Sequence, residues 1–171
     1  MKIAVLVTGG TFDKEYDEIG GILYFKEPHI QEMLTKGRCR LSVRIQVVMM
    51  KDSLEMTEQD RERILDACKT CEESRILITH GTDTMEDTAR FLADAVHDKT
   101  IVLTGAMIPY TFGSSDGLFN LGSALSFVQV LPRGVFIAMN GCCFESHEAH
   151  KDKQRGIFVR NEAASDGPDD V

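Results

Sequence analysis

The sequence has no tryptophan, no run of 18 apolar residues and no excess of basic residues. Without such an apolar run the chain offers no helix that could cross a bilayer. The first strand-like run, Met1–Thr8, reaches its glycines too soon to form the apolar core of a signal peptide, so we expect a cytoplasmic protein. Acidic residues outnumber basic ones by 27 to 19, which gives a net charge of -8. A phosphate backbone would be repelled, so we expect neither a nucleic-acid partner nor a membrane partner.

The five cysteines are an odd number at irregular spacing, which indicates reduced thiols rather than a disulfide framework. Cys68 and Cys71 have the spacing of a redox motif. They fall late in a predicted helix, far from the helix N-terminus that lowers a thiol pKa, so core packing is favoured. A zinc site would have to use Cys142, Cys143, His147 and His150. Adjacent cysteines point apart and the spacing matches no common zinc site, so we expect no metal and no cofactor.

Short β-branched runs alternate with helical patterns along the chain, which is typical of a parallel sheet covered on both faces. The predicted strands are Ile3–Thr8, Leu41–Val48, Arg75–His80, Thr100–Thr104, Val135–Met139 and Ile157–Arg160. Most are nearly continuous in Val, Ile and Leu, as in strands buried on both sides. The run Leu41–Val48 instead alternates apolar with polar residues, which predicts a place nearer the edge of the sheet.

The segments between the strands have apolar residues at intervals of three and four, which predicts helices. Thr57 is a predicted N-cap with Asp60 at the third helical position, and a helix over Pro28–Lys36 should end at Gly37. Two further stripes are Met85, Ala89, Leu92, Val96 and Leu118, Leu121, Leu125, Val128. We therefore predict one three-layer α/β domain over residues 1–163. Its sheet is mostly parallel and flavodoxin/Rossmann-like, with helices on both faces. Residues 164–171 are predicted to form a disordered acidic tail.

Three segments lack any periodic pattern and are predicted to be loops: Phe12–Gly21, Met107–Asp116 and Gly141–Arg155. Loops at the carboxyl ends of strands are where open α/β sheets bind ligands. The candidate functional residues are therefore those in and beside the loops that follow the strands.

The first strand runs into Gly9, Gly10 and Thr11. Two glycines allow a sharp turn and a close approach of a ligand to the backbone, and the turn presents the Thr11 hydroxyl at the sheet edge. A phosphate cradle is the rival interpretation, but it needs three spaced glycines and a helix directly afterwards. The following segment, Phe12–Glu18, is charged and contains four acids. A plain turn from strand to loop remains the alternative.

A second motif, His80–Ala89, joins a strand end to a predicted helix. Asp83 or Thr84 could simply cap this helix, but capping does not require Gly81 or Thr82. Backbone N–H groups at a helix start can also stabilise an oxyanion. Two more segments follow later strands. Leu103–Met107 has small residues that would leave the Ala106 carbonyl free, and Lys151 lies in a charged segment where a lysine is usually just solvated.

These segments, in this order and at this spacing, resemble the bacterial-type L-asparaginase family. The motifs that carry the resemblance are Thr8–Thr11, His80–Ala89, Leu103–Met107 and Ser115–Leu121. It extends to Asp52–Thr57 and to Met139–Gly141, Phe144, Glu145 and Lys151. It covers almost the whole chain, and the motif His80–Ala89 is its most specific part.

The resemblance implies that Thr11 is the nucleophile that attacks a side-chain carboxamide. It implies that Thr82 is a second essential hydroxyl, whose triad Asp83 and Lys151 complete. Lysine can act as a base only when burial favours its neutral form. Attack would release ammonia and leave an acyl-threonine ester, which water hydrolyses to aspartate.

The resemblance also implies the substrate contacts. Ser53 and Asp83 would hold the α-carboxylate and α-ammonium of the substrate, and the Ala106 carbonyl would accept a hydrogen bond from its amide. The other implied substrate-binding residues are Gly10, Asp52, Gly81 and Thr82. Family members also carry a catalytic tyrosine in the mobile loop after the first threonine, where it can help to activate the Thr11 hydroxyl. Both Tyr16 and Tyr24 are candidates for this role here, and core packing is the alternative for each.

The chain departs from the family in length, since full-size relatives are roughly twice as long and carry a second α/β domain. It also has Leu54 where many relatives have a polar side chain. We predict an asparaginase that acts on free L-asparagine, and more slowly on L-glutamine, and that forms a homodimer or homotetramer. The alternatives are an amino-acid-binding or regulatory protein with little turnover, and an ammonia-supplying component of an amidotransferase.

Overall fold

The computed structural model describes residues 1–161. The predicted acidic tail, residues 164–171, and the predicted domain end at residue 163 lie outside this range. A six-stranded sheet has the order β4-β1-β5-β6-β7-β8. Its strands are β1 (Lys2–Gly9), β4 (Ser42–Lys51), β5 (Arg75–Thr79), β6 (Thr100–Thr104), β7 (Gly134–Met139) and β8 (Cys142–Glu145). All neighbouring pairs are parallel except β7 and β8. The prediction of a mostly parallel α/β sheet is confirmed.

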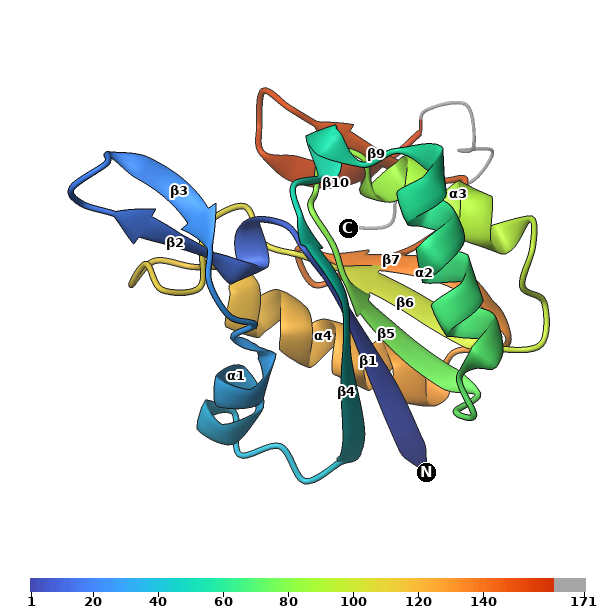
Figure 1. Cartoon of the computed structure of the whole chain (residues 1–171). Helices are drawn as coiled ribbons and strands as arrows, with labels where there is room; N and C mark the ends of the chain where they lie inside the picture. The colour runs from blue at the N-terminus through green and yellow to red at the C-terminus, as the bar shows by residue number, and fades with distance from the viewer. Residues whose placement is uncertain (162–171) are drawn as a thin grey trace.

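Four α-helices within residues 1–161 cover the two faces of the sheet (Figure 1). They are α1 (Ile30–Lys36), α2 (Glu58–Thr70), α3 (Met85–Ala93) and α4 (Gly117–Val130). Successive side chains of a strand point to opposite faces, so β1 contributes to two separate cores. Ala4 and Leu6 pack with α2 and α3, whereas Ile3, Val5 and Val7 pack with α1 and α4. The predicted three-layer arrangement follows from this alternation.

The ends of two helices agree with their sequence signals. The Thr57 side chain accepts a hydrogen bond from the Asp60 backbone, and the Asp60 side chain accepts one from the Thr57 backbone, which completes a capping box at the start of α2. The α1 helix ends at Gly37 as predicted. At α3 the capping interpretation is only partly right. Thr84 occupies the N-cap position without a capping hydrogen bond, and its hydroxyl donates instead to the Ser53 carbonyl, 2.9 Å away.

Two predicted loops contain strands, so those predictions were wrong. Phe12–Gly21 includes β2 (Lys14–Asp17), which pairs antiparallel with β3 (Ile22–Phe25). Gly141–Arg155 includes β8 and β9 (Ala149–Asp152). Each of these strands has only four residues, and β2 and β3 are partly exposed on both faces. Strands of this kind need no alternation of apolar and polar residues, so the sequence carries no periodic signal for them.

The segment Ile157–Arg160 forms β10, but it lies outside the main sheet and pairs antiparallel with β9. Phe158 and Ala149, one from each strand, are buried in the core on the α2 and α3 side. A two-stranded hairpin therefore buries this apolar run without joining the parallel sheet. The edge position predicted for Leu41–Val48 is confirmed, because β4 stands at the end of the strand order, next to β1.

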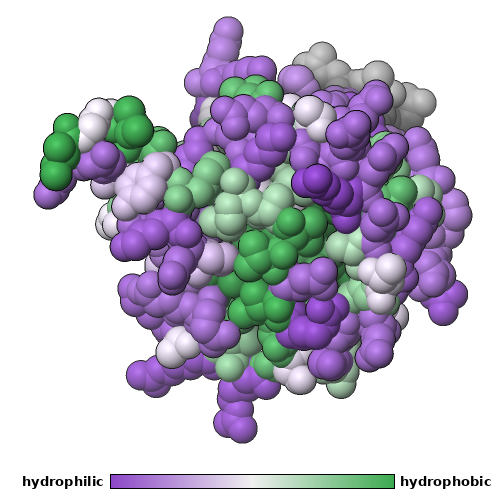
Figure 2. Space-filling model, viewed as in Figure 1, coloured by the Kyte–Doolittle hydropathy of each residue, from purple (hydrophilic) through white to green (hydrophobic). Residues whose placement is uncertain are grey.

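Most of the visible surface is hydrophilic, but Figure 2 shows apolar side chains gathered over the middle of the molecule and on the hairpin of β2 and β3. Ile19 and Ile22 on this hairpin and Val47 on β4 are exposed. No helix within residues 1–161 is long and apolar enough to span a membrane.

Candidate active site

The carboxyl ends of β1, β5 and β6 are joined by hydrogen bonds between residues at or next to the ends of these strands. The Thr8 hydroxyl donates to the Thr79 carbonyl at 2.7 Å, and the His80 N–H donates to the Thr104 carbonyl at 2.8 Å. On the other side of β1, the Gly10 N–H donates to the Lys51 carbonyl at 3.0 Å. The loops that follow these strands therefore start from one edge of the sheet.

Glycines allow these loops to touch. Gly10 has a φ of 79°, and a Cβ atom there would lie 2.5 Å from the Gly81 Cα atom. A Cβ atom on Gly81 would lie 2.5 Å from the Ser53 Oγ atom. Since real Cβ atoms do not approach so closely, both positions require glycine. The contact between Gly10 and Gly81 brings the loops that carry the next residues, Thr11 and Thr82, side by side.

Lys151 reaches this edge from β9. Its Nζ atom lies 2.7 Å from Thr82 Oγ1 and 2.8 Å from Asp83 Oδ1. Lys151 and Thr82 are both buried, whereas the Asp83 side chain is 35% exposed. The structure thus joins Thr82, Asp83 and Lys151 through direct contacts, which are three of the four central catalytic residues that the sequence predicts beside the two candidate tyrosines. The fourth, Thr11, is half-buried at the start of the short 3-10 helix η1 (Thr11–Asp13).

Ser53 packs against Gly81 and belongs to a second short 3-10 helix, η2 (Ser53–Glu55). The side chain is buried, and its Oγ atom has no hydrogen-bond partner among the described residues. A buried hydroxyl without a partner costs free energy, so a polar ligand group that bonded to it would be stabilised. Leu54 is exposed, and its apolar side chain offers no hydrogen-bonding group to a ligand.

Asp52 precedes Ser53 and accepts a hydrogen bond from the Leu54 N–H at 3.0 Å. Its carboxylate also forms an ion pair with Lys14 at the start of β2. Partial burial opposes ionisation of Asp52, but the Lys14 ammonium and the Leu54 N–H outweigh it and lower the pKa of this carboxyl. Asp52 is therefore charged near neutral pH, and it ties the β2 strand to the Ser53 segment.

Ala106 follows β6 and has no exposed surface. The Met107 N–H, which shares a peptide group with the Ala106 carbonyl, donates to Asp116 Oδ1 at 3.0 Å. The planar peptide fixes the direction of the carbonyl through this bond. In this conformation the carbonyl is covered, so a ligand would have to displace what covers it.

The two candidate tyrosines lie on opposite faces of the β2 and β3 hairpin. In its register Tyr24 faces Glu15, and its hydroxyl lies 3.3 Å from Glu15 Oε2. Tyr16 pairs with Leu23 and is 54% exposed. Figure 1 shows this hairpin projecting from the body of the molecule. No hydrogen bond within residues 1–161 links either hydroxyl to Thr11, Thr82 or Lys151.

His80 is a site residue that the sequence interpretation used only as part of a motif. It is fully buried, and burial lowers the pKa of its imidazole to about 4. Its Nδ1 atom lies 2.8 Å from the Gly81 carbonyl, and its Nε2 atom lies 2.9 Å from the Thr88 hydroxyl. A carbonyl only accepts, so Nδ1 carries the proton and Nε2 accepts from Thr88. The neutral ring thus fixes the backbone next to Thr82.

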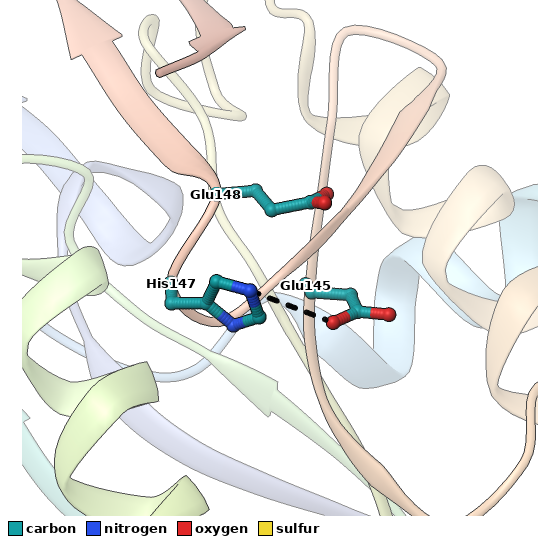
Figure 3. Close-up of side chains that lie close together, drawn as sticks. All are labelled: Glu145, His147 and Glu148. Carbon is teal, nitrogen blue, oxygen red and sulfur yellow. Dashed lines mark ion pairs between the residues drawn. The ribbon is translucent and has the colours of Figure 1, made fainter. Parts of the chain in front are cut away.

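Three potential metal ligands lie close together in the described part of the chain: Glu145, His147 and Glu148 (Figure 3). Glu145 and His147 are exposed, and Glu148 forms an ion pair with Arg160. Of the residues weighed for zinc, only His147 belongs to this group. Cys142 and Cys143 are neighbours on β8, so their side chains point to opposite faces of the strand. This is a surface cluster of charges.

Cys68 and Cys71, which have the spacing of a redox motif, lie in surroundings that disfavour their thiolates. Cys68 is fully buried on α2, and burial raises the pKa of its thiol to about 12. Burial also raises the pKa of Cys71, which follows the helix. A redox cysteine needs a lowered thiol pKa, so core packing accounts for both residues.

Comparisons with known proteins agree on one family. The family model described as "Asparaginase, N-terminal" matches residues 2–157. The chain is 38% identical over 127 residues to a glutaminase-asparaginase of Acinetobacter glutaminasificans, an alignment that covers 72% of this chain and 36% of that protein. It is 44% identical over 79 residues to L-asparaginase 2 of Escherichia coli K12, covering 44% of this chain and 23% of that protein.

Solved structures match over nearly the whole chain. The thermostable L-asparaginase of Thermococcus kodakarensis has a TM-score of 0.83 and 28% identity, over 94% of this chain and 51% of that one. The probable cytoplasmic L-asparaginase of Campylobacter jejuni has a TM-score of 0.80 and 29% identity, over 94% of this chain and 53% of that one. The chain thus spans about half the length of these structures and less of the sequence relatives. Sequence, fold and spacing agree that this chain belongs to the asparaginase family, as a match to its N-terminal domain.

Proposed function

We propose that this chain hydrolyses the side-chain amide of L-asparagine to L-aspartate and ammonia, with L-glutamine as a slower substrate. The main support is the contact of Lys151 Nζ with both Thr82 Oγ1 and Asp83 Oδ1 at the edge of the sheet. A hydroxyl is a weak nucleophile until a neighbouring base takes its proton. A buried lysine beside a threonine hydroxyl supplies such a base when it is neutral.

In the proposed reaction the Thr11 hydroxyl attacks the carboxamide carbon, and ammonia leaves to give an acyl-threonine ester. Water then attacks the ester and releases aspartate. Thr82, with Lys151, moves the protons that these two steps require. The Asp83 carboxylate favours the charged form of Lys151. An α-ammonium group of the substrate bound to Asp83 would compete for this carboxylate and so favour neutral Lys151.

Two of the proposed substrate contacts, Asp83 and Ser53, use groups that are partly exposed or have no hydrogen-bond partner among the described residues. Asp83 is partly exposed and can take the α-ammonium, while the unpartnered Ser53 hydroxyl can donate to the α-carboxylate. Gly10 and Gly81 directly precede the two threonines, and the Gly10 N–H is bonded to the Lys51 carbonyl. The Ala106 carbonyl stays the proposed acceptor for the amide N–H₂. Tyr16 or Tyr24 could assist Thr11 only if the β2 and β3 hairpin moved toward the site.

A second candidate function is ligand binding with little turnover. The chain spans about half the length of its structural relatives, so the activity of those whole proteins is a proposal for it and not a finding. The site would then bind an amino acid, or serve an amidotransferase as an ammonia source, with little turnover of its own. We also propose that the chain forms a homodimer or homotetramer and that it is cytoplasmic. Analytical ultracentrifugation would measure the number of subunits.

The test is ammonia release from L-asparagine and L-glutamine by the purified chain, beside Thr11→Ala and Thr82→Ala variants. The matched control is Thr70→Ala, which removes an exposed threonine hydroxyl at the end of α2. We expect release from the wild type and the control and loss from both site variants. A silent wild type that still binds L-asparagine by calorimetry would favour the binding protein, and full activity without Thr11 would exclude it as the nucleophile.

A further inference from the structure

A buried asparagine on α4 lies between the two halves of the site. Asn120 has no exposed surface. Its Nδ2 group donates to the Gly105 carbonyl at 3.0 Å and to Asp116 Oδ2 at 2.8 Å, and its Oδ1 atom accepts from the Asn140 N–H at 3.0 Å. Two acceptors on one side and a donor on the other allow only this orientation of the amide. The side chain therefore fixes both neighbours at once.

On one side Asn120 holds the backbone that packs against Thr82. A Cβ atom on Gly105 would clash with the His80 carbonyl oxygen and would lie 3.3 Å from the Thr82 Cγ2 atom, so Gly105 packs against the start of the loop that carries Thr82. Asp116 accepts from the Met107 and Ile108 N–H groups at 3.0 and 3.1 Å and strengthens the same turn. A shift of Gly105 would therefore displace the Thr82 side chain.

On the other side Asn120 holds Asn140, and Asn140 holds the hairpin that carries Lys151. Asn140 Oδ1 accepts from the Phe158 N–H at 2.8 Å. Phe158 is the register partner of Lys151 across β9 and β10. Phe158 and Lys151 form a non-hydrogen-bonded pair of this antiparallel ladder, so their N–H groups point away from each other. These N–H groups therefore need acceptors outside the hairpin.

Both of these outward N–H groups have one. The Lys151 N–H donates to Glu86 Oε1 on α3 at 2.5 Å, and the Phe158 N–H donates to Asn140. The pair is thus anchored from two sides. Asn140 itself has a φ of 56°, in the left-handed region that asparagine tolerates better than most residues.

We propose that Asn120 and Asn140 are positioning residues that hold the Thr82 hydroxyl and the Lys151 ammonium at bonding distance from opposite sides. This inference rests on the function proposed above, since it gives that contact a catalytic purpose. Neither asparagine touches the reacting groups. They act through Gly105 and Phe158, and a loss of position by a fraction of an ångström would reduce turnover more than substrate binding.

The test compares two substitutions at Asn140. Asn140→Gly removes the acceptor for the Phe158 N–H but keeps the left-handed backbone at no steric cost. Asn140→Asp keeps an acceptor oxygen in the same place and is the matched control. We expect kcat to fall about 10- to 100-fold in Asn140→Gly with KM changed less than about threefold, and Asn140→Asp to retain most of the wild-type kcat. Equal kcat values in all three proteins would overturn the proposal.

Amide hydrogen exchange supplies a readout that does not need activity. We expect faster exchange at Lys151 and Phe158 in Asn140→Gly, with Val102 in β6 unchanged. Uniformly faster exchange would mean general destabilisation and would contradict a local role. If the wild type released no ammonia, the proposed function would fail, while the exchange result would still decide whether Asn140 anchors the Lys151 strand. Asn120→Ala should show a larger loss of kcat and faster exchange at the same two amides. If Asn120→Ala does not fold, the comparison of Asn140→Gly with Asn140→Asp still tests the proposal.

Discussion

Lys151 Nζ lies 2.7 Å from Thr82 Oγ1, although the two residues are 69 positions apart in the chain. Thr82 follows a central strand of the sheet, whereas Lys151 comes from a hairpin outside it. The contact exists only because β9 and β10 fold back over the carboxyl end of the sheet. Every proposed chemical step depends on this contact.

The first prediction concerns Lys151 itself. Lys151→Met keeps the length of the side chain and removes the group that can move a proton, so we expect kcat for amide hydrolysis to fall by roughly 10²- to 10⁴-fold. Ammonia release measures the rate, and thermal unfolding shows whether the fold survives. Lys153→Met, which changes an exposed lysine on the same hairpin, should leave both unchanged. Turnover at the wild-type rate in Lys151→Met would remove the lysine from the mechanism.

The second prediction concerns pH and His80. Its pKa is about 4 in the folded protein and near 6.5 in an unfolded chain, because burial disfavours the charged ring. Between these values the unfolded chain binds more protons, so the free energy of unfolding should fall as the pH decreases from 6.5 to 4. The full loss is up to about 3 kcal/mol. Urea unfolding across this range should show a flatter profile in His80→Gln.

Asp13 makes the comparison with the variant necessary. Burial raises the pKa of its carboxyl to about 6, although its hydrogen bond from the His29 N–H and the nearby His29 ring oppose this rise. Its contribution to stability is therefore present below the ordinary value of 3.8 and is lost as the pH rises through 6. The two groups act in opposite directions over almost the same range. Subtracting the His80→Gln profile from that of the wild type isolates the histidine, and a difference that does not vary with pH would contradict the prediction.

The main sheet could be predicted because strands buried on both faces leave a simple trace in the sequence. Residues Ile76–Thr79 are all buried, and only apolar or small polar side chains fit there. The hairpins leave no such trace. Lys151 can be buried on β9 because its ammonium group forms an ion pair with Asp83 and a hydrogen bond with Thr82. An ion pair between segments that are distant in the chain produces no periodic pattern in the sequence.

The site was predictable to the extent that glycines and hydroxyls mark the turns after strands. Gly10 and Gly81 stand where two backbones touch, and the residue after each is a proposed catalytic threonine. The supporting residues were missed for a different reason. Asn120 and Asn140 act through hydrogen bonds to backbone groups up to 20 positions away, and an asparagine in a helix or after a strand has many commoner explanations.

The third prediction concerns thiol reactivity. Cys68 is fully buried with a pKa near 12, whereas Cys142 is exposed on β8. Only the thiolate reacts with iodoacetamide, so we expect native protein at pH 8 to be alkylated at Cys142 and not at Cys68. Mass spectrometry of the digested protein identifies the modified residues. Labelling in denaturant, where all five cysteines should react, is the control, and equal native rates at both positions would show that α2 opens readily.

The fourth prediction concerns the contact between Gly81 and Ser53. A Cβ atom on Gly81 would lie 2.5 Å from Ser53 Oγ and 2.6 Å from Ser53 Cβ. The hydroxyl could rotate away, but Ser53 Cβ is fixed to the backbone and could not. Gly81→Ala must push the two loops apart, which should cost about 1–3 kcal/mol of stability. Because Thr82 follows directly, we also expect ammonia release to fall at least about tenfold. Gly113→Ala is the matched control, since a Cβ atom there meets nothing within 4 Å. If Gly81→Ala had the same stability and the same rate of ammonia release as Gly113→Ala, the loops would have room for a side chain at Gly81. The close packing of Ser53, Gly81 and Gly10 would then not determine the geometry of the site.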